Sequence, residues 1–497
     1  MAAEASGGAG GGETKLEDVY PAGAEALFDA TVPDPSETLG GKTDDIEPDA
    51  PNVIMHVVKQ LMPGQDLTRV TIPSFYLESR SLLEKLADVM MHPQLIIDAS
   101  AHDDPAERML SVTRWFLSGW HYKTVGVKKP YNPVIGETFA CAWTHEDGSR
   151  SQYFAEQVSH RPPVSAMFME NRRHNITANA QVWTQSRFKA PQTAVSIMAG
   201  GVRLRFTDRD EEYFITLPSF FAHGLLLGTL RMEIGGDATI VCEKTGHRAD
   251  IKFKQKPMMS GEYNVVQGSI SVGKAKLFDI AGKWDTQLDV IDRRAKKKSE
   301  LLVDVRREPI APKEVLPIDK QGPWESRRLW AGVTAALQKR PTVDWMAVDR
   351  LKGKIEDDQR TLPCHQEGAA FRPWKTKCFR LVPFSNPLTG ETEEVWEMVH
   401  SRYTPYAAGE KENNVLWLSR MTADDRTGEA ESIPGVDGAA AAADEGTAKS
   451  TVSEAGRTGA AAAGEATATA SGGAGGASAA APAATAAGTG ASAGSGG

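Results

Sequence analysis

The hydrophobic pattern of the chain has a helical period first and a period of two afterwards. Apolar residues recur at helical spacing over residues 82–90, so we predict a helix there that ends at Pro93. A second helix is predicted to begin at Asp103 or Asp104, with Pro105 in its first turn. Residues 52–62 also have apolar residues on one helical face, so three elements at helical period precede the first predicted strands.

From Lys128 on, apolar and polar residues alternate. Val202, Leu204 and Phe206 alternate with polar residues, and the turn residues 208–212 follow, which predicts a hairpin. Residues 269–290 predict a meander with glycines at its reversals. A succession of short strands without intervening helices predicts an antiparallel sheet that curls into a barrel or splits into a sandwich.

Helical spacing returns near the end of the alternating region. Residues 323–340 and residues 343–360 both have apolar residues at helical intervals. We therefore expect a mainly β fold with additional helices on either side of the sheet in the sequence.

Composition divides the chain into three parts. Residues 1–51 form an acidic leader rich in Gly, Pro and Asp, and residues 422–497 form a tail rich in Ala, Gly, Ser and Thr. Both contain few large apolar side chains, so neither can offset the entropy cost of ordering its backbone. We predict disorder in both and one large domain over residues 52–421.

Charge and cysteine usage narrow the functional classes. The formal net charge of −9 argues against bulk binding to nucleic acid, and the 4 cysteines show no metal-binding spacing. No apolar run is long enough for a membrane-spanning helix, and the N-terminus lacks a secretory signal pattern. The expected location is the reducing cytoplasm.

The string EQVSHRPP at residues 156–163 is the most unusual local motif. Pro162 pushes Arg161 out of the helical region, so His160 and Arg161 are expected on a stiff, extended segment. An imidazole beside a guanidinium suits an anion such as a phosphate. The alternative is a histidine bonded to a backbone carbonyl beside a solvated arginine.

Two further motifs carry charge at ordered positions. KKPYNPVIGETF at residues 128–139 presents Lys129 and Asn132 on a proline-stiffened stretch, with a turn at its Gly-Glu pair. Lys352, Glu356 and Arg360 follow at intervals of four on one helical face. Taken separately, these motifs also fit a surface turn and a solvated salt-bridge ladder.

An enzymatic function is disfavoured by the same residues. Ser159 and His160 are adjacent on an extended segment, so their side chains point to opposite faces and cannot form a nucleophile–base pair. The G-x-S-x-G match around Ser492 lies in the low-complexity tail. We expect no catalytic residue, cofactor or metal.

Together, these motifs resemble the oxysterol-binding-protein-related family. EQVSHRPP is similar to the family's signature, whose usual form has two histidines where this chain has His160 and Arg161. KPYNP with IGETF, the helix RMLSVTRWFLSGW and the K-x-x-x-E-x-x-x-R face occur in the family's order. The resemblance implies a lipid-transfer domain: an incomplete antiparallel barrel around an apolar tunnel, closed by an N-terminal lid at about residues 52–72.

The resemblance also implies a set of lipid-binding residues. It assigns the acyl-chain contacts to Leu61, Leu67 and Ile72 in the lid. The lipid head-group set is Lys129, Asn132, His160, Arg161, Ser186, Lys352, Glu356 and Arg360.

The cargo implied first is phosphatidylserine, exchanged for phosphatidylinositol 4-phosphate. The lid, the first helix and TQSRF, which contains Ser186, resemble the phosphatidylserine-carrying subgroup, and sterol is the alternative cargo. Arg161 departs from the family's pattern: it either strengthens phosphate binding, which we favour, or crowds the inositol ring.

Two partner hypotheses and one alternative function follow. Residues 25–34 partly resemble the peptide that docks on VAMP-associated proteins of the endoplasmic reticulum, which would place the protein at contact sites of that organelle. Basic residues at 293–298 would contact anionic membranes peripherally. A lipid sensor or tether with the same pocket is the alternative to a transporter.

Overall fold

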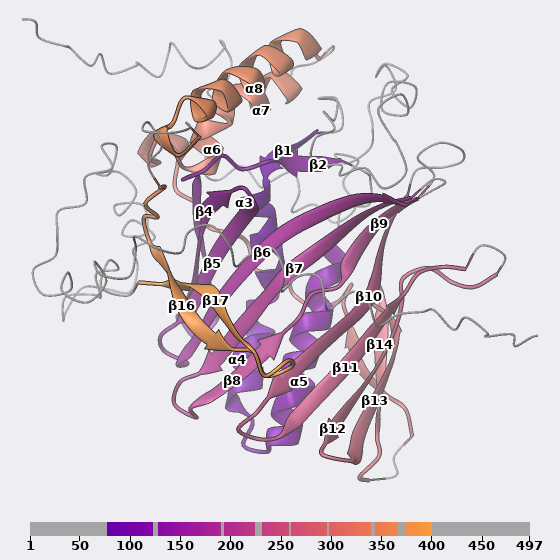
Figure 1. Cartoon of the computed structure of the whole chain (residues 1–497). Coiled ribbons are helices and arrows are strands. Elements are labelled where there is room, and N and C mark those ends of the chain that lie inside the picture. Colours follow the sequence, from indigo (N-terminus) through magenta and orange to yellow (C-terminus); the bar gives the residue numbers. More distant parts are fainter. Residues whose placement is uncertain are drawn as a thin grey trace, which may run out of the picture. The chain divides into compact units, whose positions relative to one another are not determined.

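The computed structural model describes residues 77–122, 128–189, 193–223, 231–257, 260–295, 298–338, 343–365 and 373–399 (Figure 1). The chain divides into two compact units, Met1–Glu431 and Ser432–Gly497, and the described residues all belong to the first. The predicted leader, lid and tail, with Leu61, Leu67 and Ile72 and the segment 25–34, lie outside the described residues.

An antiparallel sheet of 13 strands dominates the described part of the chain. Most strands pair with the next strand in the sequence, and the short β9 pairs with β7 and β10. One sheet, rather than a sandwich of two, therefore results from the alternating region. Its strands are β3 (Thr138–Thr144), β4 (Arg150–His160), β5 (Pro163–Asn171), β6 (Ile176–Lys189), β7 (Thr193–Phe206), β8 (Glu211–Ile215), β9 (Ser219–His223), β10 (Arg231–Cys242), β11 (His247–Lys254), β12 (Val265–Val272), β13 (Ala275–Lys283), β14 (Gln287–Asp292) and β15 (Glu300–Asp304).

Alternation in the sequence becomes alternation of burial in the sheet. In β11, Ala249, Ile251 and Phe253 are buried while the residues between them are more exposed. The predicted hairpin is confirmed as β7 and β8, joined by a turn at residues 207–210. The meander is confirmed as β12 to β14, but only one reversal uses glycine: Gly273 lies in a turn, whereas Gly282 lies within β13. Contrary to the expectation of short strands, β6 and β7 each span 14 residues.

The first helices pack on one face of the sheet. The helix expected over residues 82–90 is α3 (Leu82–Leu86) continued by the 3-10 helix η5 (Ala87–Met90). Pro93 ends that run but also opens a helix that the pattern did not predict, α4 (Pro93–Ala101), because proline fits the first helical turn. The second expected helix is α5 (Pro105–Ser118), capped by Asp104, and η6 (Gly119–Tyr122) follows it.

The remaining elements precede or follow the large sheet in the sequence. The strands β1 (Leu77–Ser81) and β2 (Lys129–Tyr131) pair in parallel. After the large sheet come η7 (Ile318–Lys320), α6 (Ser326–Leu329), α7 (Ala331–Gln338), α8 (Trp345–Arg360) and η8 (Pro363–His365). A final hairpin, which the sequence pattern did not predict, consists of β16 (Phe379–Ser385) and β17 (Thr392–Met398).

Both faces of the sheet are covered, by different elements (Figure 1). Residues of α4 and α5, among them Trp115 and Phe116, join strand residues such as Ile251 and Phe253 in the largest buried cluster. The hairpin β16–β17 covers part of the other face, where Phe379 stacks on Phe154 at 6.0 Å between ring centroids. We call the α4–α5 side the inner face of the sheet.

The sheet does not close into a complete barrel. Its path ends at β15 on one side and β3 on the other. The free edge of β3 is bonded instead by the segment after β15: Ala142 forms an isolated bridge with Glu314, and Thr138 forms one with Glu325. The expected incomplete antiparallel barrel with flanking helices is confirmed, because the edge strands β3 and β15 do not pair with each other.

The Glu137 carboxylate joins three elements beneath β2. Its oxygens accept hydrogen bonds from the Ser81 hydroxyl, the Ser326 hydroxyl at 2.7 Å, the Trp330 indole at 2.9 Å and the Val134 amide at 3.1 Å. Glu137 is fully buried, and burial raises its pKa although these hydrogen bonds lower it. The turn that carries this residue is therefore a structural anchor and not a surface turn.

Replacement of Glu137 should destabilise the fold strongly. The variant Glu137→Ala leaves several buried donors without an acceptor, so we expect a loss of about 2–4 kcal/mol in the free energy of unfolding. Urea denaturation followed by circular dichroism measures it. The control Glu146→Ala removes an exposed carboxylate in the β3–β4 turn and should change stability by less than about 0.5 kcal/mol. Equal midpoints for the two variants would contradict the anchoring role.

Candidate functional site

The first part of the site is the stretch around β2. Tyr131 is fully buried, stacks on Trp330 at 4.7 Å between ring centroids and bonds its hydroxyl to Thr334 at 3.0 Å. This anchoring fixes the neighbouring Lys129 and Asn132, both of which remain exposed to solvent. A rigid tyrosine therefore presents a cation and an amide on either side of it.

The second part is the connection between β4 and β5. His160 is the last residue of β4 and is half-buried, whereas Arg161 is exposed in the turn that follows. The expectation of an extended pair is thus wrong for Arg161, because β5 begins at Pro163 and pairs back with His160. The Arg161 guanidinium is nevertheless close enough to His160 to help lower the pKa of the imidazole.

The third part is α8, and the predicted helical face is confirmed. Lys352 donates to Glu356 at 2.5 Å, and Arg360 lies 4.0 Å from the same carboxylate. Arg360 also pairs with Asp357. Asp344 caps the helix by accepting the Ala347 amide at 3.0 Å.

A side chain that the sequence analysis missed, Gln359, bridges all three parts. It is buried; its carbonyl accepts the Ile135 amide at 2.8 Å, and its amide nitrogen lies 3.4 Å from His160 Nδ1. Residues 128–139, the end of β4 and α8 therefore meet at one place. In the sequence, Gln359 is one polar residue among the many charged residues of this helix. Only its burial in the structure sets it apart from them.

The charges of these groups act on one another. Desolvation by surrounding protein atoms, followed by the Lys352 ammonium, lowers the pKa of Lys129, while Glu356 raises it; Lys129 nevertheless keeps exposed surface. Desolvation also lowers the pKa of His160, to about 4, with further contributions from His365, Arg161 and Arg360. The structure thus brings together five residues of the sequence-derived set around the sixth, Glu356, and places Asn132 on the same stretch as Lys129.

Positive groups outnumber negative ones in this cluster. Its permanent cations are Lys129, Arg161, Lys352 and Arg360, and its carboxylates are Glu356 and Asp357. A site with surplus positive charge and partly desolvated imidazoles suits an anion. Such a site can bind a phosphate or a carboxylate.

Ser186, the eighth head-group candidate, lies on β6. It is half-buried and opposes Ser196 of β7. Side chains alternate along a strand, so Ser186 shares the inner face with Val182, a member of the largest buried cluster. Ser186 thus lies on the inner face of the sheet. It is not among the residues that α8 brings together in the cation cluster.

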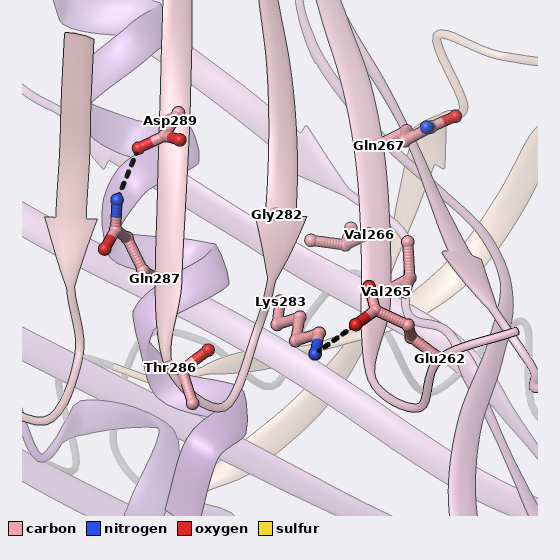
Figure 2. A pocket seen from close by; sticks show the side chains of 9 residues that line it. All are labelled: Glu262, Val265, Val266, Gln267, Gly282, Lys283, Thr286, Gln287 and Asp289. Carbon is pink, nitrogen blue, oxygen red and sulfur yellow. Dashed lines mark hydrogen bonds and ion pairs between the residues drawn. The ribbon is translucent and has the colours of Figure 1, made fainter. Parts of the chain in front are cut away.

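A separate hollow of about 390 Å³ lies between β12, β13 and β14 (Figure 2). Lys283 donates to Glu262 at 3.0 Å, and the Gln287 amide donates to Asp289 at 2.8 Å. Figure 2 marks both contacts with dashed lines. These polar groups satisfy one another, and the sheet places several strands between them and β4. We do not assign a ligand to this hollow.

Within the described ranges, no group of three His, Cys, Asp or Glu side chains comes together in a way that could hold a metal ion. In the same ranges, no helix has the length and apolar character needed to cross a membrane.

The His160 pKa is directly testable. In the protein without ligand, the imidazole should titrate near pH 4, well below its ordinary value of 6.5. In the variant Arg161→Gln, a neighbouring positive charge is lost, so imidazolium formation becomes easier and the pKa should rise. Titration of the histidine ring signals by NMR measures both values. The control Arg173→Gln, on the β5–β6 turn, should leave the His160 pKa unchanged, and an unshifted pKa in Arg161→Gln would contradict the arrangement.

Comparison with known proteins places the fold and the motifs in context. A family model described as oxysterol-binding protein matches residues 54–343. An oxysterol-binding protein homolog of Schizosaccharomyces pombe is 36% identical over 362 residues, which cover 70% of this chain and 74% of that protein. Human oxysterol-binding protein-related protein 8 is 33% identical over 392 residues, which cover 76% of this chain and 43% of the human protein.

Solved structures share the fold. The Osh1 ORD domain in complex with ergosterol has a TM-score of 0.59 at 22% identity, over 83% of this chain and 99% of that domain. The Osh3 ORD in complex with PI(4)P from Saccharomyces cerevisiae has a TM-score of 0.54 at 21% identity, over 71% of this chain and 92% of that one.

The family match extends over more than half of the chain and includes the stretches that carry Lys129 and His160. The chain therefore belongs to the oxysterol-binding protein family, whose members are lipid-binding and lipid-transfer proteins and not enzymes.

Proposed function

We propose that the protein extracts phosphatidylserine from one membrane and exchanges it for phosphatidylinositol 4-phosphate at another. The observation that carries the proposal is the meeting of three distant stretches of chain in one cation-rich cluster. The Gln359 amide joins them through Ile135 and His160. Family membership supplies the reaction class, which is lipid binding and transfer.

The phosphate of the inositol head group would occupy the cation cluster. A phosphomonoester carries about −1.5 to −2 charges at pH 7, which the ammonium and guanidinium groups can offset. The proposed ligands are Lys129, Asn132, His160, Arg161, Lys352 and Arg360, with Glu356 orienting the two cations on its own helix. A relative of known structure, the Osh3 ORD, was solved with PI(4)P.

The acyl chains would lie against the inner face of the sheet. Met198, Val202 and Phe220 pack on the largest buried cluster but remain partly exposed, so they offer apolar surface that the described core does not cover. Each CH₂ group moved from water to such a surface gains about 0.8 kcal/mol. In the proposal, Leu61, Leu67 and Ile72 of the lid complete this environment.

The proposal of phosphatidylserine as cargo rests on a residue that would contact its head group. Ser186 faces inward on β6 and can accept or donate a hydrogen bond to a serine head group. Sterol is a second candidate because the Osh1 ORD domain, which shares the fold, was solved with ergosterol.

Membrane contact completes the proposal. The protein would act in the cytoplasm as a peripheral membrane protein, with basic residues such as Arg293 and Arg294 near anionic lipids. Residues 25–34 would dock on a VAMP-associated protein at contact sites of the endoplasmic reticulum. Lipid transfer between donor and acceptor liposomes tests the exchange: tight binding of both lipids without transport would identify a sensor or tether instead.

Lys352 provides a test of the phosphate site with a matched control on the same helix. The variant Lys352→Ala removes a cation of the cluster, so extraction of phosphatidylinositol 4-phosphate from liposomes should fall about tenfold or more. Lys354→Ala removes an exposed lysine two residues away, and extraction should remain near the wild-type level. A similar loss in both variants would indicate general membrane attraction rather than a phosphate site.

Ser186 provides a test of the cargo. Ser186→Ala should reduce extraction of phosphatidylserine about tenfold, because a hydrogen bond to a charged head group is lost, while extraction of phosphatidylinositol 4-phosphate is retained. The exposed Ser299→Ala serves as the control. Wild-type extraction of phosphatidylserine by Ser186→Ala would remove this residue from the head-group set, and preferential extraction of sterol by the wild type would favour the second cargo.

A further inference from the structure

A second imidazole lies beside His160, contributed by the 3-10 helix η8 after α8. The His365 ring packs against the His160 ring with centroids 4.8 Å apart and ring planes at 75°. His365 is half-buried, and it follows α8 closely enough to share the site with Gln359 and Arg360. None of the three motifs singled out in the sequence contains it.

The polar atoms of this pair are not all accounted for by packing. Gln359 engages His160 at Nδ1, which leaves Nε2 as the other nitrogen of that ring. The Nε2 atom of His365 is buried and has no hydrogen-bond partner among the described residues. An aromatic hydrocarbon ring would pack equally well there without a desolvated nitrogen, so an imidazole at this position points to a missing partner.

The charges around the two rings define that partner. Desolvation and then Arg161 lower the pKa of His365, and the same guanidinium contributes to the low pKa of His160. The two imidazoles and the guanidinium each disfavour positive charge on the others. An anion would offset the guanidinium charge and accept hydrogen bonds from the N–H groups of the two rings. The charged groups that act on the pair are Arg161 from the β4–β5 turn and Glu356 and Arg360 from α8. Glu356 also pairs with Lys352 and acts on Lys129, and Arg360 pairs with Asp357.

We propose that His365 is a further anion-binding residue of this site, which pairs with His160 and Arg161 to bind a phosphomonoester group. The inference rests on the proposed function for the membrane source of that group, a phosphoinositide head group. Free phosphate has the same chemistry, and the experiment below separates the two sources.

Two substitutions of His365 test the role of its ring nitrogen. His365→Ala removes the nitrogen, and His365→Gln keeps an N–H donor on a side chain of similar reach. The control is His174→Ala, which removes a histidine bonded to Asp147 at the opposite end of β4 and β5. Each protein is incubated with liposomes that contain either phosphatidylinositol 4-phosphate or phosphatidylserine, and the extracted lipid is quantified.

We expect His365→Ala to extract the phosphoinositide about tenfold less than the wild type while its extraction of phosphatidylserine is unchanged. His365→Gln should keep at least half of the wild-type phosphoinositide extraction, and His174→Ala all of it. The proposal is overturned if His365→Ala extracts the phosphoinositide like the wild type, if it loses both lipids equally, or if His365→Gln behaves like His365→Ala.

Failure of the proposed function gives a different result. A wild-type protein that extracts phosphatidylserine but no phosphoinositide contradicts the exchange and, with it, the role of His365. A second arm measures binding of inorganic phosphate by ³¹P NMR. A difference between wild type and His365→Ala in the lipid arm alone assigns the site to a membrane head group, and a difference in both arms shows that free phosphate also binds.

Discussion

The buried amide of Gln359 is the constraint on which the rest of the site depends. Its carbonyl must accept the Ile135 amide and its nitrogen faces His160, because polar groups removed from water require partners. These two contacts hold α8 against the β2 stretch and against the end of β4. Because the backbone segments are already held together, the long side chains of the cluster need to span only short distances. Most of the entropy cost of bringing them together is therefore part of the cost of folding.

The large sheet separates two kinds of surface. Its inner face carries the helices α4 and α5 and, along β6, β7 and β9, apolar side chains that are only partly covered. Part of its other face is covered by the hairpin β16–β17, where Phe154 and Phe379 are almost fully buried. The cation cluster lies where β4 ends and α8 packs against it.

The sequence allowed good prediction where one local period decides the outcome. The hairpin β7–β8 and the charged face of α8 follow directly from spacings of two and four residues. Gln359 and His365 could not be identified in this way, because their roles depend on which distant segments pack against α8. The turn position of Arg161 was also missed, since the prolines beside it restrict the backbone without deciding where β4 reverses. Glu137 looked like a turn residue, and only the arrival of Ser326 and Trp330 shows that it is an internal anchor.

Glu156, in the signature string, links the large sheet to the last described part of the chain. Its buried carboxylate accepts the Lys377 amide at 2.7 Å and the Cys378 amide at 3.0 Å, which secures the chain entering β16. The family match ends at residue 343, well before that point. An expression boundary drawn there would delete α8 and the final hairpin, strip the cover from Phe154 and Phe168, and yield a fragment prone to aggregation. The folded part of the chain therefore extends beyond the stretch that the family model matches.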